Sequence, residues 1–310
     1  MPISNEPRTL PALEDRDSLY REELQSPPHH HVIDPNDPVW GVAGALLVWL
    51  ASIVVQAIIP LLFIIPFALH RGLNPGSPDF ARSALELAVT DKTAILLQIV
   101  SILPTHILTL GLVWVFVTRF GRRPFLSSLG WRSNGAAKLW ETVGFVGLGV
   151  ALFVIAAPLT KLLGAEKPTQ LEQLINSSFA ARYAIAALAV FTAPFVEEFV
   201  YRGVLYSALQ RLIGVKAAVL LVLGLFTLIH VPQYWPNVGV ISAVALLSIV
   251  LTIVRAYSGR LLPCIIIHMS FNAVQALLLI VEPFFQQPVP PTAPVVPTAS
   301  MLLPLLHFFF

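Results

Sequence analysis

The amino-acid sequence predicts an all-α protein, a polytopic bundle of about seven transmembrane helices. The first observation behind this is composition. Of 310 residues, 56% are hydrophobic and 12% are charged, whereas soluble domains carry about 25% charge. The second is a mean hydropathy of +0.77. The third is that the apolar residues gather in runs near the ~20 residues that cross a hydrocarbon core of about 30 Å.

The same composition excludes several classes of protein. A net charge of +2 is too small to indicate a nucleic-acid partner. The single cysteine, Cys264, rules out an intrachain disulfide and a cysteine-clustered metal site, and we interpret it as a packing residue. The polar N-terminus lacks the basic start and apolar core of a cleavable signal peptide, so the first span is expected to act as the targeting signal.

The chain divides into four regions by composition. They are a disordered polar tail (1–38), a membrane scaffold of three spans (39–179), a membrane core that carries polar motifs (180–285) and a proline-rich tail (286–310). His29, His30 and His31 are interpreted as a solvated run in the first tail rather than as a metal site. The last nine residues, too short to span, lie in the membrane interface or are disordered.

The hydrophobic spans are predicted at 40–69, 93–118, 139–160, 181–209, 216–235, 238–256 and 261–285. The first two carry no acidic residue and are interpreted as lipid-facing scaffold. Pro104 and His106 in the second span indicate a kink or a polar contact, and His106 is assigned to packing. The loop 161–180 is expected to hold a short helix at the surface.

Basic residues predict the orientation of the chain. The densest cluster lies in the loop 119–138. With that loop in the cytoplasm, the cytoplasmic segments hold twelve basic residues and the opposite side holds six, so the N-terminus is expected to be cytoplasmic. We expect a multi-pass integral protein of the inner membrane if the source is bacterial, or of the endoplasmic reticulum if it is eukaryotic.

The stretch APFVEEFVYR, residues 193–202, places three charged residues inside the fourth span. Each costs roughly 2.5–3.5 kcal/mol at the centre of a bilayer, so a reason for them is required. Glu198 and Arg202 are four residues apart and can pair on one helical face, either as a structural ion pair or as part of a site. Glu197 has no partner on its own helix, which favours a functional role. Pro194 predicts a kink one turn earlier.

Further ionisable side chains occur in two later spans. Phe226 and His230 lie one turn apart in the fifth span, and His268 and Asn272 lie one turn apart in the seventh. Isolated polar groups on apolar helices usually face the bundle interior. Glutamate and histidine can activate water near neutral pH, as general bases or as metal ligands.

These three motifs together resemble the CAAX-protease and bacteriocin-processing family of intramembrane endopeptidases (CPBP, or Abi), which includes the Ras-converting CAAX endopeptidase. The motifs are E-E-x-x-x-R at 197–202, F-x-x-x-H at 226–230 and H-x-x-x-N at 268–272, and all three are complete. The resemblance covers about 180–285 and makes the last four spans the catalytic core. It implies hydrolysis of a peptide bond in a membrane-associated peptide or protein.

The resemblance also implies roles for individual residues. Glu197 would act as the general base on water, shared with His230. Glu198, held by Arg202, would orient the site and tune the basicity of Glu197. His268 and Asn272 would donate hydrogen bonds to the oxyanion. No cofactor is required in this scheme, but a divalent metal such as zinc is the alternative, with Glu197, His230 and His268 as candidate ligands.

Two expectations remain open to other outcomes. A non-catalytic binding or transport protein could use the same polar cavity, because buried Glu, His and Arg also serve proton relays. Oligomeric state does not follow from the sequence.

From the positions of Glu197 and His268 in their spans, about 18 and 10 Å from the cytoplasmic face, the cavity is expected to open on the N-terminal side.

Overall fold

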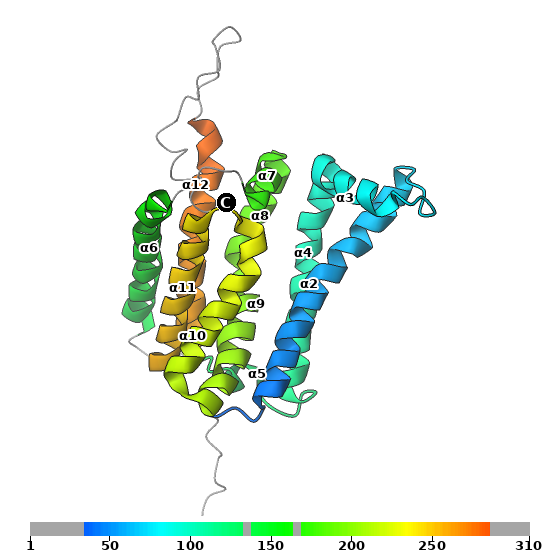
Figure 1. Cartoon of the computed structure of the whole chain (residues 1–310). Helices are drawn as coiled ribbons and strands as arrows, with labels where there is room; N and C mark the ends of the chain where they lie inside the picture. Colours follow the sequence, from blue (N-terminus) through cyan, green and yellow to red (C-terminus); the bar gives the residue numbers. More distant parts are fainter. Residues whose placement is uncertain (1–33, 133–137, 164–168, 286–310) are drawn as a thin grey trace, which may run out of the picture. The chain divides into compact units, whose positions relative to one another are not determined.

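The computed structural model describes residues 34–132, 138–163 and 169–285. Within these ranges the chain forms helices and no strand (Figure 1). The membrane helices are α2 (Val42–His70), α4 (Lys92–Thr118), α6 (Lys138–Leu162), α8 (Phe179–Phe191), α9 (Ala193–Glu198), the π-helix η1 (Phe199–Leu205), α10 (Tyr206–Tyr234), α11 (Val238–Ser258) and α12 (Leu262–Val281). Shorter helices are α3 (Phe80–Thr90), α5 (Phe125–Ser128), α7 (Gln170–Asn176) and the 3-10 turn η2 (Glu282–Phe284).

The membrane spans agree with the prediction from the sequence. Six helical runs in the described part of the chain are long and apolar enough to cross a membrane. One of them, Phe179–Tyr234, has 56 residues, about 84 Å at 1.5 Å per residue, and therefore holds two crossings. Gly214, with φ at 77°, interrupts it between the predicted fourth and fifth spans. Glycine favours this left-handed conformation because it has no Cβ.

The connections hold more structure than the sequence predicts. Helix α3 packs against α4 in a segment interpreted as loop. The predicted short helix of the loop 161–180 is α7, and it begins with a capping box in which Thr169 and Glu172 satisfy each other's backbone N–H groups. Helix α7 is not a pure surface helix, because Ile175 is buried in the core with residues of α8 and α12.

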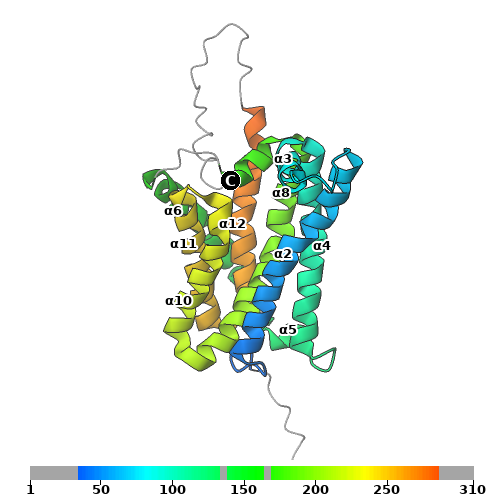
Figure 2. The same ribbon diagram turned by 45° about the vertical axis from the view of Figure 1, so that its right-hand side comes forward.

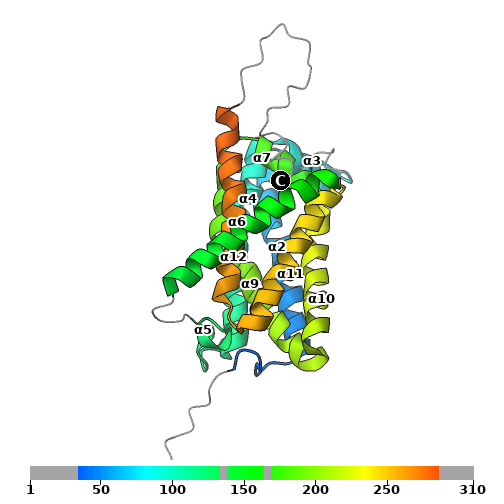
Figure 3. The same ribbon diagram turned by 90° about the vertical axis from the view of Figure 1, so that its left-hand side faces the viewer.

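Helices α2 and α4 lie side by side, as do α10 and α11 (Figure 2). Helix α6 crosses α12 and α11 obliquely (Figure 3). The crossing is close at Gly149, where a Cβ would lie 2.5 Å from the Ile267 carbonyl oxygen. Small residues let membrane helices approach in this way. At the start of both helices, Arg260 forms an ion pair with Glu141.

The outer helices present apolar side chains to lipid. Of the most apolar 18 residues of each helix, 17% are buried in α2 and 44% in α11. Leu47, Leu61 and Leu62 of α2 are exposed, as a helix facing hydrocarbon requires. These exposed side chains are consistent with the interpretation of the first span as lipid-facing on one side, while Ala45, Val48 and Ser52 on the other side are buried in the bundle. Cys264 is buried, as its assignment to packing requires.

Two of the predicted features fall largely outside the described residues. These are the histidine run at 29–31 and the tail 286–310. Of the predicted polar tail 1–38, residues 34–38 are described, and they pack on the bundle. Arg255 of α11 donates to the Pro35 carbonyl at 3.0 Å and to Asn36 Oδ1 at 2.8 Å.

Candidate active site

The segment that carries the two glutamates is not one regular helix. Helix α8 ends at Phe191, and α9 begins at Ala193 with Pro194 in its first turn. Thr192 between them has φ −123° and ψ −43°. Proline is tolerated in a first turn because the N–H that it lacks has no partner there. The interruption predicted at Pro194 is thus present, as a break between two helices.

Directly after Glu198 the backbone widens into the π-helix η1. Such turns are rare and occur frequently at functional sites. The carbonyl of Arg202, within η1, accepts a hydrogen bond from Arg255 Nε of α11 at 3.2 Å. The widened turn is therefore tied to a neighbouring membrane helix, which holds the glutamates at a defined depth and rotation.

The predicted ion pair is formed, and it is completely buried. Arg202 Nη1 donates to Glu198 Oε1 at 3.0 Å, and both side chains are 0% exposed. The other guanidinium nitrogens donate to Thr252 Oγ1 at 3.3 Å and to the carbonyl and Oγ of Ser248 at 2.9 and 3.0 Å. The Arg202 guanidinium also lies 4.7 Å from the centre of the Phe226 ring. These hydrogen bonds satisfy the guanidinium, as a buried ion pair requires, whereas Oε2 of Glu198 is buried without a hydrogen-bond partner among the described residues.

His268 of α12 connects the two glutamates. Its Nδ1 lies 2.8 Å from Glu198 Oε1, and its Nε2 lies 3.8 Å from Glu197 Oε2. A carboxylate paired with Arg202 can only accept, so Nδ1 carries the proton of the imidazole. In the neutral ring, Nε2 is then an acceptor that faces Glu197. The side chain of Glu197 is 21% exposed, against 0% for Glu198. Glu197 is therefore the accessible carboxylate.

His230 of α10 has the same tautomer. Its Nδ1 lies 2.7 Å from the Phe226 carbonyl oxygen, which can only accept, so Nδ1 is the donor and Nε2 the acceptor. The ring also stacks on Tyr234, with centroids 6.2 Å apart and an interplanar angle of 8°. Both motif histidines thus leave Nε2 without a hydrogen bond among the described residues, and that of His268 faces Glu197 Oε2 at 3.8 Å.

Asn272 lies one turn after His268 and is partly engaged. Its Nδ2 donates to the Ala189 carbonyl of α8 at 2.8 Å. An amide group carries two N–H donors, so one remains for a ligand. The same bond fixes which face of the amide points inward.

A cavity of about 230 Å³ brings the predicted site residues together. Glu197, His230, His268 and Asn272 line it. Glu198 and Arg202 are placed behind it, and they reach the cavity only through His268. The predicted convergence is therefore found for four residues, with the ion pair as their support.

The lining of the cavity extends toward the end of the bundle opposite to the one where an opening was expected. Its lining extends from Glu197 to Leu171 of α7, Tyr234 at the end of α10 and Val240 near the start of α11. Helix α7 and the α10–α11 connection lie away from the start of α2 (Figure 1). The lining of the cavity therefore does not favour the expected opening on the N-terminal side. The depth of a residue along its own span does not show which end of the bundle is filled by side chains of neighbouring helices.

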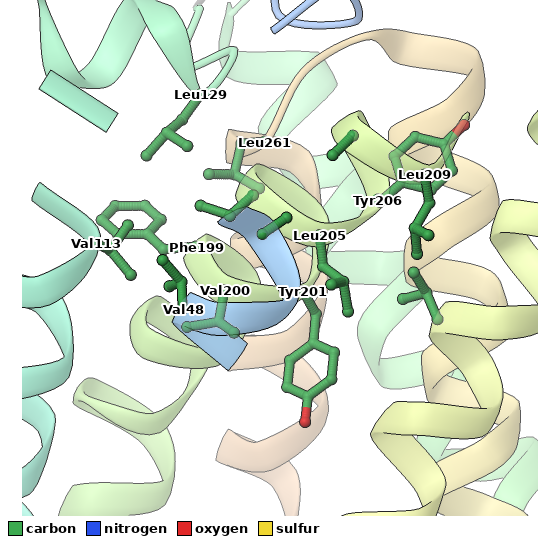
Figure 4. Close-up of a cluster of buried hydrophobic side chains, with 14 of the residues drawn as sticks. Val48, Val113, Leu129, Phe199, Val200, Tyr201, Leu205, Tyr206, Leu209 and Leu261 are labelled. Atoms are coloured by element: carbon green, nitrogen blue, oxygen red, sulfur yellow. The ribbon is translucent and has the colours of Figure 1, made fainter. Parts of the chain in front are cut away.

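The N-terminal end of the site is closed by an apolar cluster around η1. Trp40, just before α2, is buried there and donates from Nε1 to the Val204 carbonyl at 3.1 Å. Figure 4 shows side chains of this cluster, which come from η1, α2, α4 and the starts of α10 and α12 and include Phe199, Val200, Leu205, Val48, Val113, Leu129 and Leu261. These side chains fill the bundle at its N-terminal end.

Sequence reasoning missed His106 as a residue of the site. It lies on α4, lines the cavity, and places Nδ1 2.8 Å from Thr192 Oγ1. That hydroxyl donates to the Leu188 carbonyl at 3.0 Å, so His106 is the donor at Nδ1. The interpretation of the second span as lipid-facing is wrong for this face. A histidine two residues after Pro104 in an apolar helix was the available signal.

The predicted metal candidates are Glu197, His230 and His268. Both histidines donate Nδ1–H to an oxygen, as metal-binding histidines do. However, no three His, Cys, Asp or Glu side chains of the described residues gather in a group that could hold a metal ion. The need for a metal therefore stays a question for experiment.

The comparisons with known proteins concern the same segment. Residues 179–274 match the family model described as type II CAAX prenyl endopeptidase Rce1-like. The matched range contains all three motifs and supports assignment of the chain to the CAAX protease family. No curated protein and no solved structure gave a match.

Proposed function

We propose that this chain is an intramembrane endopeptidase that cleaves a membrane-associated protein or peptide with water activated by Glu197. One observation carries the proposal: Glu197 Oε2 faces His268 Nε2 at 3.8 Å inside a cavity of the helix bundle. The family match supports the class of reaction, since its description names a CAAX prenyl endopeptidase.

The separation of Glu197 and His268 suits a bridging water. A gap of 3.8 Å is too long for a hydrogen bond, but one water can bond both groups. That water would donate to the Glu197 carboxylate and to Nε2 of His268 or His230, both of which are acceptors in the neutral ring. Its oxygen then keeps a lone pair for attack on the peptide carbonyl, and Glu197 takes the proton.

The supporting residues act on the charges that follow. As the carbonyl oxygen becomes an oxyanion, the remaining N–H of Asn272 is its donor. His268 is a second donor if its ring already carries a proton on Nε2 before the water attacks and keeps it through the cycle, in which case the water donates to Nε2 of His230 instead. Such a donor contributes roughly 2.7–4 kcal/mol in other hydrolases. Glu198 stabilises the imidazolium through Nδ1, and Arg202 pairs with Glu198 and holds it in place. Glu197 finally passes its proton to the leaving amine.

The cavity also indicates the kind of substrate. Beyond the motif residues, its lining is largely apolar, with Ile185, Leu188, Val244 and Leu247 among the contacts. Such a lining favours an apolar segment, and the polar groups at one end fix its orientation. We therefore expect substrates that reach the site from the membrane.

Glu197→Gln tests the proposal directly. Turnover of a fluorescence-quenched farnesylated CAAX peptide, and of an unprenylated peptide library, is measured with protein purified in detergent. We expect a fall of about 10²–10⁴-fold in kcat, because the amide keeps the shape of the carboxylate and cannot accept a proton. Glu86→Gln on exposed α3 is the matched control and should retain full activity. Near-wild-type turnover by Glu197→Gln would overturn the mechanism.

A chelator arm separates the two chemical routes. Each protein is assayed with and without a chelator, and again after addition of zinc. Unchanged turnover supports the glutamate route, whereas loss that zinc restores assigns water activation to a metal. If the wild-type protein cleaves neither the farnesylated peptide nor any peptide of the unprenylated library, the alternative, a non-catalytic binding or transport protein, is favoured.

A further inference from the structure

A second cavity, of about 130 Å³, borders the same glutamate. Glu197, His230 and Gln233 line both cavities. The rest of the second lining comes from α2, α4, η1 and neighbouring turns, and includes Ser52, Gln56, Thr109 and Tyr201. The carboxylate of Glu197 therefore stands between a large cavity that suits a substrate and a small one.

Thr109 of α4 indicates that the small cavity has a polar occupant. Its side chain is fully buried, and its Oγ1 has no hydrogen-bond partner among the described residues. Thr105 and Thr118 on the same helix donate to the carbonyl four residues earlier, at 2.8 and 2.7 Å. Thr109 forgoes that bond, although an unpaired buried hydroxyl costs about 1–3 kcal/mol. A ligand in the cavity would remove this cost.

The remaining polar groups show which ligand fits. Tyr201 OH accepts from Trp49 Nε1 at 2.9 Å and keeps its own proton to donate. Ser52 donates to the Trp49 carbonyl at 2.6 Å and can therefore accept. Gln56 supplies both kinds of group. Apart from Glu197 and His230, the polar groups of the lining are neutral, and a mixture of neutral donors and acceptors suits water. The volume exceeds the ~30 Å³ share of one water several times.

We infer that this cavity is a water chamber, which holds ordered water on Thr109 and Gln56 and supplies Glu197 from the side opposite to the substrate. The inference rests on the proposed role of Glu197. Each turnover consumes one water: its oxygen bonds to the carbonyl carbon, one proton passes through Glu197 to the leaving nitrogen, and the C–N bond breaks. Water from the chamber then replaces it while peptide still fills the larger cavity.

Substitution of Thr109 tests the chamber by a split between kcat and KM. Thr109→Val keeps the shape and removes the hydroxyl, and we expect kcat on the farnesylated peptide to fall about tenfold with KM unchanged. Thr109→Ser should restore kcat to within about twofold, because it restores the hydroxyl. Thr105→Val is the matched control with wild-type kcat. Gln56 lies on an exposed face, so Gln56→Leu does not disturb a buried position needed for folding. This variant should also lower kcat.

A structural readout accompanies the kinetics. Experimental structures of the wild type and Thr109→Val are compared at a resolution that shows water. We expect a water within hydrogen-bond distance of Thr109 Oγ1 in the wild type and its loss in the variant. A dry chamber in the wild type, or wild-type kcat in Thr109→Val and Gln56→Leu, overturns the inference. If the chamber inference is overturned but Glu197→Gln is inactive in the same assay, the proposed function still stands. If Glu197→Gln is active, the proposed function fails whatever the chamber holds.

Discussion

At the scale of the residue, hydrogen-bond partners decide what each histidine can do. His106, His230 and His268 all donate from Nδ1, to a threonine hydroxyl, a backbone carbonyl and a carboxylate respectively. Each therefore keeps Nε2 for whatever enters the cavity. Glu198 is the clearest case of a residue that acts through another, because it is fully buried and touches the reaction only through His268.

Arg202→Ala should reduce folding as well as activity. The substitution leaves Glu198 buried without its counter-charge, which costs roughly 3–5 kcal/mol when one partner of a buried pair is removed. We expect a lower melting temperature in detergent and less monodisperse protein after size-exclusion chromatography. Arg71→Ala is the matched control: its pair with Asp91 is formed by a side chain that is 47% exposed, so its melting temperature should stay near the wild type. Normal yield and stability for Arg202→Ala would show that the pair does not support the fold.

At the scale of the element, the site depends on two irregularities of the helix backbone and on one close contact between helices. The break at Thr192 and the π-helix η1 set the rotation of the glutamates, because regular α-helical winding is interrupted on both sides of α9. The close approach of α6 at Gly149 sets the position of α12 one residue before His268. Each of these three features lies within one or two turns of a motif residue or packs against such a turn.

Gly149→Ala should separate α6 from α12. The added Cβ would lie 2.5 Å from the Ile267 carbonyl and 2.7 Å from Ser270 Cβ, so the helices must move apart. We expect a fall in melting temperature, together with lower kcat because His268 follows Ile267. Gly147→Ala on the same helix meets no heavy atom of the described residues within 4 Å and should be neutral. Equal behaviour of the two variants would argue against close packing of α6 on α12.

At the scale of the whole molecule, the direction of the opening matters most for biology. The lining of the cavity extends to the α7 end of the described bundle, which lies away from the start of α2 in Figure 1. The bias of basic residues, twelve against six, predicts that the start of α2 lies on the cytoplasmic side. Together these predict a site that takes its substrate from the non-cytoplasmic side.

Cysteine labelling tests this orientation. Asp79→Cys, before α3, and Tyr257→Cys, at the end of α11, are both exposed and mark the α7 end and the N-terminal end. In bacterial cells that express the protein, an impermeant maleimide should label Asp79→Cys directly and Tyr257→Cys only after permeabilisation. The buried Cys264 should give little background. The reverse pattern would place the opening of the cavity in the cytoplasm.

The sequence by itself determined the class of fold, the membrane spans and the residues of three motifs. Those features are local: an apolar run of the length of a bilayer, a spacing of four residues, and a proline at a helix break can all be recognised without knowing the neighbours. The ion pair of Glu198 and Arg202 was predictable for the same reason.

Only the tertiary structure decided which end of the bundle the cavity reaches, that His106 belongs to the site, and that Glu197 borders a second cavity. Each depends on contacts between segments far apart in the chain, such as Trp40 with Val204 or α4 with α8. The hydrophobic periodicity of a span carries no information on which neighbour covers a given face, because every face of these helices is apolar. The tautomers of the histidines also follow from those neighbours alone.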